Sequence, residues 1–209
     1  MTRSTPLNRD TVLDAARDLF AAQGYRGTSM KDVATALDVR APSLYNHVVS
    51  KQEMLFAIMD AAMVRALDAL DAALWGVDDG AEQLRLATES LVLDFLRHPA
   101  EVTICNVEVR SLDHATRPAI IAKRDRYARR VRSIIDAGCA SGRFATVNPQ
   151  LAAYAVLELG NGAKSWFASA GPLTEQQVAT AYGEFALLVV QDAGPASHPA
   201  DCDPRSLTE

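Results

Sequence analysis

The sequence predicts an all-α protein with a three-helix, helix-turn-helix head at the amino end and a larger helical body behind it. Leu and Ala far outnumber the β-forming residues, which favours helices, and hydrophobic residues make up 49% of the chain. Apolar residues also recur at helical spacing, and several of these runs begin with a helix-capping residue. A length of 209 residues suits one compact unit, or two small units that share a helix.

The first helix of the head is expected to run from a cap at Asn8 to about Gln23, with Gly24 as its stop. Its apolar residues fall on one face of the helix. This face should pack across the back of the two helices that follow, because a lone helical hairpin has no core of its own. The residues of the face are Val12, Leu13, Ala16, Leu19 and Phe20.

A helical hairpin follows between residues 29 and 48. Ser29 and Asp32 have the spacing of a capping box, in which each side chain accepts a hydrogen bond from an otherwise unpaired backbone amide. A turn over 38–41 leads to a second helix, Pro42–Val48, in which proline at or near the first position costs no hydrogen bond. This second helix contains no acidic residue and carries polar side chains on its outer face. A rod of that size fits the major groove of DNA.

Ser50 and Glu53 form a further capping signature, which opens a long helix reaching about Trp75 and joining head to body. Five body helices are expected over about 81–97, 100–112, 118–140, 149–168 and 174–191. The last two are apolar, rich in small residues and low in charge, so we place a dimeric four-helix bundle there; an ordinary intramolecular core is the alternative. The predicted boundaries are 1–52 for the head, 53–193 for the body and 194–209 for a disordered tail.

Charge is distributed unevenly along the chain. Residues 1–51 hold seven Lys and Arg against five Asp and Glu, a net of +2, while the remainder holds fourteen against twenty-one, a net of −7. The head can therefore attract phosphate although the whole chain carries −5. No apolar run reaches the ~18 residues of a membrane span, and the amino end has no signal-peptide core, so we expect a cytoplasmic protein without a membrane partner.

The head resembles the tetracycline-repressor (TetR) family of transcriptional regulators, over about residues 9 to 57. The matching residues are Ala16, Leu19, Phe20, Gly24, Tyr25, Thr28, Ser29, Val33, Ala34, Val39, Ser43, Leu44, Tyr45, His47, Val48, Ser50, Lys51, Met54 and Leu55. The resemblance implies a homodimeric repressor on a palindromic double-stranded DNA operator, with a ligand-binding and dimerising body.

Nine head residues are candidate DNA contacts. Pro42 can touch a thymine methyl group, and Ser43 or Asn46 can hydrogen-bond to base edges. Arg40 can reach either a base or the backbone. Phosphate contacts are expected from Ser29, Lys31, Tyr45, His47 and Lys51. Lys51 lies in the first turn of its helix, where the dipole disfavours a cation, so we interpret it as a phosphate clamp. Many family members carry a longer polar residue where this chain has Ala41, so base readout there is lost.

A second resemblance concerns the body. Ser165-Trp166-Phe167 and the stretch 171–178 are similar to TetR regulators of fatty-acid and steroid-ring catabolism, which respond to acyl-CoA thioesters. This implies a hydrophobic effector of that class. Candidate cavity residues are Leu91, Phe95, Cys105, Val109, Tyr127, Trp166 and Phe167, with Asn161 or Arg110 as polar anchors. The basic stripe over 123–132 is either a solvated helix face or a holder for an anionic ligand.

The sequence leaves two other classes of function open. Cys105 or Cys139 could sense oxidants if its thiol pKa were lowered, although three cysteines without CxxC spacing offer neither a disulfide framework nor a zinc site. A small-molecule-converting helical enzyme is the other class, but the chain has no HExxH, no nucleophile elbow and no glycine-rich phosphate loop. We therefore expect no enzyme, no metal and no cofactor.

Overall fold

The computed structural model describes residues 7–190, and all regular structure in that range is helical, as predicted. The predicted carboxy-terminal tail, Cys202 and most of the amino-terminal arm fall outside these residues. None of the helices in 7–190 combines the length and apolarity needed to cross a bilayer. The helices are α1 (Arg9–Gly27), α2 (Met30–Ala36), α3 (Ala41–Leu44), α4 (Lys51–Ala73), α5 (Gly80–Arg97), α6 (Pro99–Val107), the 3-10 helix η1 (Glu108–Ser111), α7 (Arg117–Ala140), α8 (Pro149–Trp166) and α9 (Glu175–Val190).

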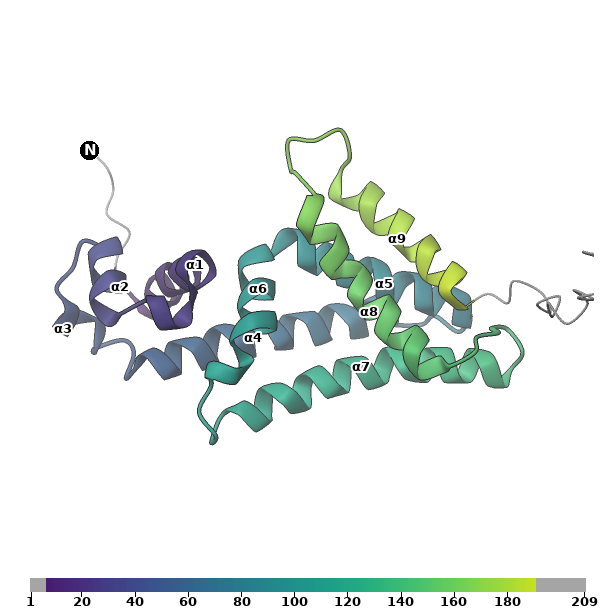
Figure 1. The fold of residues 1–209 in the computed structure, drawn as a ribbon, viewed down its shortest axis with the longest axis horizontal. Helices are drawn as coiled ribbons and strands as arrows, with labels where there is room; N and C mark the ends of the chain where they lie inside the picture. The colour runs from purple at the N-terminus through teal and green to yellow at the C-terminus, as the bar shows by residue number, and fades with distance from the viewer. Residues whose placement is uncertain (1–6, 191–209) are drawn as a thin grey trace, which may run out of the picture.

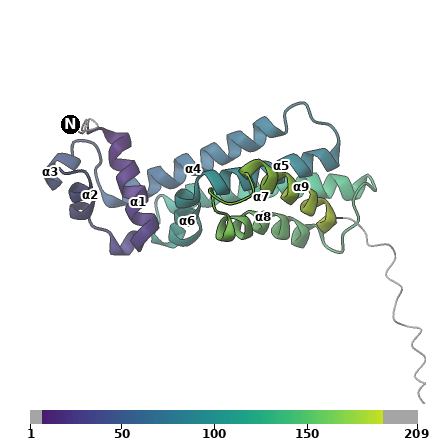
Figure 2. The ribbon, with the colours of Figure 1, turned by 90° about the horizontal axis from the view of Figure 1, so that it is seen from above.

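The molecule is elongated, with α1, α2 and α3 gathered at one end (Figure 1). Helix α4 leaves this head and runs along the body, and α7 runs beside it. Helix α5 is the centre of the body, because it packs against α4, α6, α7, α8 and α9. Helices α8 and α9 lie side by side on one face, as Figure 2 shows from above.

Local capping sets the starts of the head helices. The Asn8 side chain accepts from the Thr11 amide at 2.9 Å, and the Ser29 hydroxyl accepts from the Asp32 amide at 3.2 Å; each is half of a reciprocal capping box. At Gly24 φ is +78°, a conformation that glycine adopts at little cost, so α1 bends there before one further helical turn. These starts and the Gly24 break agree with the sequence prediction.

The expected extent of the second hairpin helix was wrong. Helix α3 ends at Leu44, whereas the sequence predicted a helix to Val48. Beyond Leu44 the amides of Tyr45, Asn46 and His47 bond three residues back rather than four, at 3.3, 3.4 and 2.9 Å. The chain therefore tightens into turns of 3-10 type, which shortens the α-helical rod but keeps these side chains on the outer surface.

The hydrophobic core of the head extends into the body. One cluster of buried residues begins with Val12 and Phe20 and continues through α4 to Ile104, Leu112 and Ile120. Helix α6 and the start of α7 therefore share a core with the head. Any shift of α6 must be accommodated by residues that pack directly under α1.

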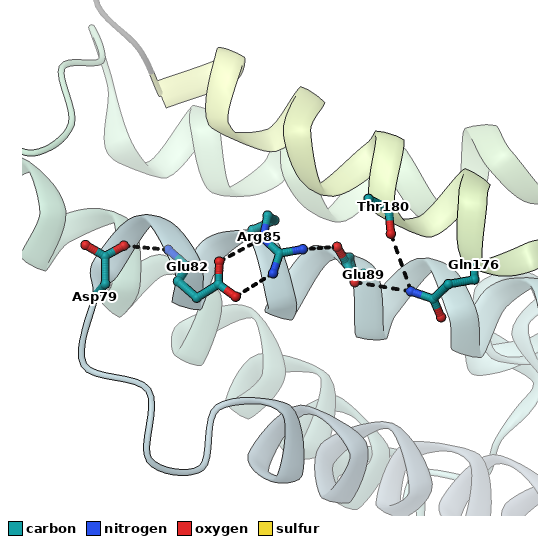
Figure 3. A network of polar contacts seen from close by, with 6 residues as sticks. All are labelled: Asp79, Glu82, Arg85, Glu89, Gln176 and Thr180. Carbon is teal, nitrogen blue, oxygen red and sulfur yellow. Dashed lines mark hydrogen bonds and ion pairs between the residues drawn. The ribbon is translucent and has the colours of Figure 1, made fainter.

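Helices α5 and α9 approach closely, and polar side chains lie at part of their contact (Figure 3). Glu89 is only 8% exposed, and its carboxylate accepts from Arg85 and, at 3.4 Å, from the Gln176 amide of α9. Gly183 of α9 lies against this pair, because a Cβ there would be 3.1 Å from the Arg85 carbonyl oxygen. The absence of a side chain at Gly183 permits the approach, and the paired charges make the burial of Glu89 tolerable.

Candidate DNA-contacting surface and ligand cavity

The surface of the head presents the predicted contact residues around α3. Asp38, with φ of +53°, makes the left-handed turn that reverses the chain between α2 and α3. Leu44 is fully buried beneath α3 and anchors it. Six of the predicted residues are exposed and the remaining three are half-buried. The exposed set is Ser29, Lys31, Arg40, Pro42, Tyr45 and Asn46, and the half-buried set is Ser43, His47 and Lys51.

Two of the exposed side chains carry uncompensated positive charge. Within residues 7–190, neither Lys31 nor Arg40 has a carboxylate within ion-pair distance. Ser29 is less free, because its hydroxyl both accepts from the Asp32 amide and donates to the Asp32 carboxylate at 2.8 Å. These bonds lower the pKa of Asp32. Lys31 and Arg40 are therefore available to phosphate, whereas Ser29 is already engaged in its cap.

Lys51 has structural partners that the sequence interpretation missed. Its ammonium donates to the carbonyl oxygens of Tyr25 and Thr28 at 3.0 and 2.8 Å, and it lies 4.1 Å from the centre of the Tyr25 ring. These contacts give Lys51 a structural role that its interpretation as a phosphate clamp did not include. The ammonium ties the start of α4 to the end of α1, and one donor remains for a phosphate.

A cavity of about 530 Å³ lies in the body between α4, α5, α6, α7 and α8. Its size falls within the usual range of small-molecule sites. Ala62, Met63 and Ala66 of α4 form one wall, so the helix that leaves the head also borders the cavity. Six of the nine predicted ligand residues line it, namely Leu91, Phe95, Cys105, Val109, Tyr127 and Asn161.

The other three predicted ligand residues do not line this cavity. Trp166 is 51% exposed at the end of α8, and its indole nitrogen donates to the Tyr182 hydroxyl at 3.1 Å. Phe167 packs instead into a separate cluster with α5 and α9. Arg110 is exposed on η1. Aromatic residues at the end of a helix can serve the contact between helices equally well, so their type alone did not reveal which side they face.

The structure adds polar residues that the sequence interpretation did not list as cavity residues. Arg124 lines the cavity and donates to the Cys105 carbonyl oxygen at 3.3 Å. The Asn106 amide donates to Asn161 at 2.7 Å, and Asn161 donates to Glu158 at 2.8 Å, which links α6 to α8 at the cavity. The place of Arg124 in the basic stripe was a partial sequence signal. The bond between Asn106 and Asn161 had no signal in the sequence, because the two residues lie far apart along the chain.

Burial sets the ionisation of two cavity side chains. Desolvation raises the pKa of the Cys105 thiol to about 11, with Arg124 acting weakly in the opposite direction. Desolvation also raises the pKa of the Tyr127 hydroxyl well above its usual value. Both groups are neutral at physiological pH, so they present a polarisable, uncharged wall to a ligand. A protonated, buried thiol is also a poor redox sensor.

Comparison with known families matches both parts of the chain. A family model described as bacterial regulatory proteins of the tetR family matches residues 12–58, and one described as a tetracyclin repressor-like C-terminal domain matches residues 77–190. The chain belongs to the TetR family. As a member it is a transcriptional regulator with an amino-terminal helix-turn-helix, which confirms the interpretation of the head drawn from its sequence.

Individual TetR relatives agree with this assignment. The chain is 27% identical over 180 residues to the transcriptional repressor KstR2 of Mycobacterium tuberculosis, covering 83% of this chain and 88% of the relative. A tetR-family regulatory protein from Rhodococcus RHA1 superposes with a TM-score of 0.80 at 28% identity, covering 90% of this chain and all of the other. The regulator AibR, solved with isovaleryl coenzyme A and operator DNA, gives 0.77 at 27% identity, covering 86% and 97%.

Proposed function

We propose that this TetR-family protein is a ligand-responsive repressor that acts in the cytoplasm as a homodimer on a palindromic operator. A hydrophobic effector of the acyl-CoA thioester class, bound in the body, releases it from DNA. The observation that carries the proposal is the position of the cavity, whose wall includes the same helix, α4, that begins at the head. The relatives support it, because KstR2 is a repressor and AibR was solved with an acyl-CoA and operator DNA.

In this proposal the head reads DNA through the region around α3. Pro42, Ser43 and Asn46 face the bases, while Lys31 and Tyr45 reach phosphate. Free positive charge at Lys31 and Arg40, with no acidic residue in α3, supports this orientation. Two such heads must reach successive major grooves about 34 Å apart, which is why a dimer is required.

The dimer interface is placed on the outer face of α8 and α9. This face exposes large apolar side chains: Leu151, Tyr154, Trp166, Phe185 and Leu188 are each about half exposed or more. Pairing the same two helices from a second copy would cover these residues with a four-helix bundle. Phe185→Glu combined with Leu188→Glu should give a monomer by light scattering, whereas Val147→Glu, in the loop before α8, should leave a dimer. A dimer in the double variant would refute this interface.

Effector and operator affinity are coupled through α4 and α6. A ligand that contacts Met63 and Ala66 on one side and Val109 on the other touches α4 and η1, and both of these elements contribute to the core shared with the head. Its effect on DNA binding equals the ratio of its affinities for the DNA-competent and released arrangements. A ratio of a hundred corresponds to about 2.7 kcal/mol.

The operator proposal is tested with fragments of the protein's own promoter. Tyr45→Ala should weaken binding at least tenfold, because it removes an exposed contact beside α3 without disturbing a packed core. Trp75→Ala is the matched control: it removes another exposed aromatic side chain, 88% exposed, just beyond the far end of α4. Equal footprints for Tyr45→Ala and the unmodified protein would contradict the assignment.

The effector proposal is tested by a thermal-shift screen. Acyl-CoA thioesters of increasing chain length are compared with free fatty acids and with coenzyme A alone, and each positive compound is tested for release of the promoter fragment. A thioester that raises the melting temperature should also dissociate the complex with DNA. If no thioester shifts the melting temperature, the effector class is wrong while the operator proposal stands.

A further inference from the structure

The body cavity adjoins a second, smaller groove. A groove of about 170 Å³ lies between α7 and α8, and it shares four lining residues with the cavity. The shared residues are Asp125, Ala128, Tyr154 and Leu157. The cavity and the groove are therefore adjoining parts of one depression along the contact of the two helices.

The lining changes from apolar to basic along this depression. The cavity holds Leu91, Phe95 and Val102, and Arg124 stands at its α7 side. The groove adds Arg129 and Arg132 from α7, with Gln150 from the start of α8. Eight residues separate Arg124 from Arg132, which is about 12 Å along a helix. The three arginines therefore follow the depression away from its apolar part.

Two of the three arginines along the depression, Arg124 and Arg129, have no carboxylate partner among the described residues. Lys123 and Arg126 pair with Asp60 and Asp71 of α4. By contrast, neither Arg124 nor Arg129 forms an ion pair within residues 7–190. Arg132 pairs with Asp136 at 3.3 Å, in an exposed contact like that of Arg126 with Asp71.

Acidic groups are present but unevenly placed. Asp125 lines the shared segment, and Asp94 lines the cavity, where it pairs with Arg65 at 2.8 Å. Glu158 lies at the opposite, α6 side of the cavity, where it accepts from Asn161. The far end of the groove keeps a surplus of positive charge. Guanidinium groups bind phosphate oxygens in bidentate fashion, so a surplus of this kind beside an apolar cavity suits a ligand with an apolar part and a phosphate-bearing part.

We propose that the α7–α8 groove binds the phosphates of the effector through Arg129 and Arg132, while the acyl part of the same molecule occupies the cavity. This rests on the proposed function, and it assigns the coenzyme A portion of an acyl-CoA thioester to a particular part of the chain. Arg124 lines the cavity but not the groove and donates to the Cys105 carbonyl oxygen of α6, so it is not assigned to the phosphates. The coenzyme portion then adds affinity through charge, and the acyl portion gives selectivity through fit.

The test compares an acyl-CoA with a ligand that lacks its phosphates and the adenosine that they carry. The acyl-CoA that binds best in a titration series is measured beside the matching S-acyl-pantetheine, which has the same acyl chain and thioester but no phosphate. We expect the acyl-CoA to bind at least tenfold more tightly, and its affinity to fall with added salt, because ionic contacts are screened. Equal affinity of the two ligands would overturn the assignment.

Variants then locate the contact. Arg129→Gln with Arg132→Gln should weaken acyl-CoA binding at least tenfold, abolish most of its salt dependence and leave S-acyl-pantetheine binding unchanged. Arg130→Gln is the control, since Arg130 is an exposed arginine of the same helix that lies toward α4 and outside the groove. Circular dichroism melting of each variant checks that the fold is retained.

The possible outcomes distinguish a failure of the groove assignment from a failure of the proposed function. If acyl-CoA binds and releases the promoter but the arginine pair can be replaced without effect, the groove is a solvated face and the inference is wrong while the proposed function holds. If no acyl-CoA binds at all, both the groove assignment and the effector class are wrong, and operator binding measured in parallel still tests the repressor.

Discussion

The carboxylate of Glu108 accepts a hydrogen bond from the backbone amide of Tyr25 at 3.0 Å, which joins the start of η1 to the bend of α1. The same carboxylate accepts from the Ser111 hydroxyl at 2.7 Å. Gln52 of α4 makes a second link, donating to the Ser111 carbonyl oxygen at 2.7 Å and accepting from the Asp113 amide at 3.1 Å. The segment that follows the α6 wall of the cavity is thus fastened to the head at two points.

Replacing Glu108 tests the first of these points. Glu108→Ala removes the acceptor and leaves the partly buried Tyr25 amide unpaired, so we expect a loss of about 1–3 kcal/mol in the free energy of unfolding. Hydrogen exchange at residues 24–28 should accelerate. Asp68→Ala removes an exposed carboxylate on α4 and should change stability by less than about 0.5 kcal/mol. Unchanged exchange at Tyr25 in Glu108→Ala would show that the bond does not hold the head.

Substitutions at Lys51 and Lys31 should distinguish a structural role from a DNA-binding role. Lys51→Met keeps the apolar stem but loses two carbonyl partners and the contact with the Tyr25 ring, so it should destabilise the protein by about 2 kcal/mol. Lys31→Met should leave the melting temperature unchanged, because its ammonium is exposed and has no partner in the described chain.

The DNA affinities of these two variants provide the second measurement. Lys31→Met should weaken binding to the promoter and reduce the salt dependence of that binding by about one ion, as expected for one lost phosphate contact. For Lys51→Met, weaker DNA binding should follow the loss of head stability. A fully stable Lys51→Met protein would contradict the structural role of this lysine.

Two glycines of α8 form a matched pair for the cavity. A Cβ at Gly160 would lie 2.8 Å from Cδ2 of the Phe95 ring, which lines the cavity, whereas a Cβ at Gly162 would meet nothing within 4 Å. Gly160→Ala should therefore displace the ring, cost about 1–3 kcal/mol of stability and change effector affinity. Gly162→Ala should stabilise the helix by about 0.5–1 kcal/mol. Identical melting curves and titrations for the two variants would contradict this packing.

The ionisation of Cys105 predicts slow thiol chemistry. With a pKa of about 11, on the order of one thiol in a thousand is ionised at pH 8, and only the thiolate reacts. In a protein with Cys139 and Cys202 replaced by Ser, iodoacetamide labelling should be slow at pH 7 to 8, accelerate toward pH 11 and become fast on denaturation. Peroxide should leave promoter binding intact. Rapid labelling of the folded protein at pH 7 would revive the redox-sensor alternative.

Much of the fold was predictable because its signals are local. A cap lies three residues from its partner, as in Ser29 with Asp32 and Ser50 with Glu53, so composition and spacing already specify the helix start. The end of α3 was less predictable. Whether Tyr45 continues a helix or enters a tighter turn depends on how Leu44 and Val48, both buried, anchor the segment to the head core.

The site was only partly predictable for the same reason. Five of the six cavity residues could be predicted because apolar residues at helical spacing face the interior, and the sixth, Asn161, was predicted as a polar anchor. The spacing does not show whether a residue faces the cavity or a contact between helices. Trp166 and Phe167 end α8 against α9, away from the cavity, and only the packing of those helices shows it. The same holds for the basic stripe of α7: Arg126 pairs with Asp71 of α4 and Arg132 lines the groove beside α8, although both are arginines of one helix.

By itself the sequence determined the helices, their caps, the helix-turn-helix and the family, because each of these depends on residues within a few positions of one another. Only the tertiary structure decided that Lys51 binds the end of α1, that Glu108 holds Tyr25, and that the cavity continues into an arginine-lined groove. These pairs lie 23 and 83 residues apart, and the groove joins two helices. Contacts over such separations are set by how whole helices pack, which periodicity along the chain does not encode.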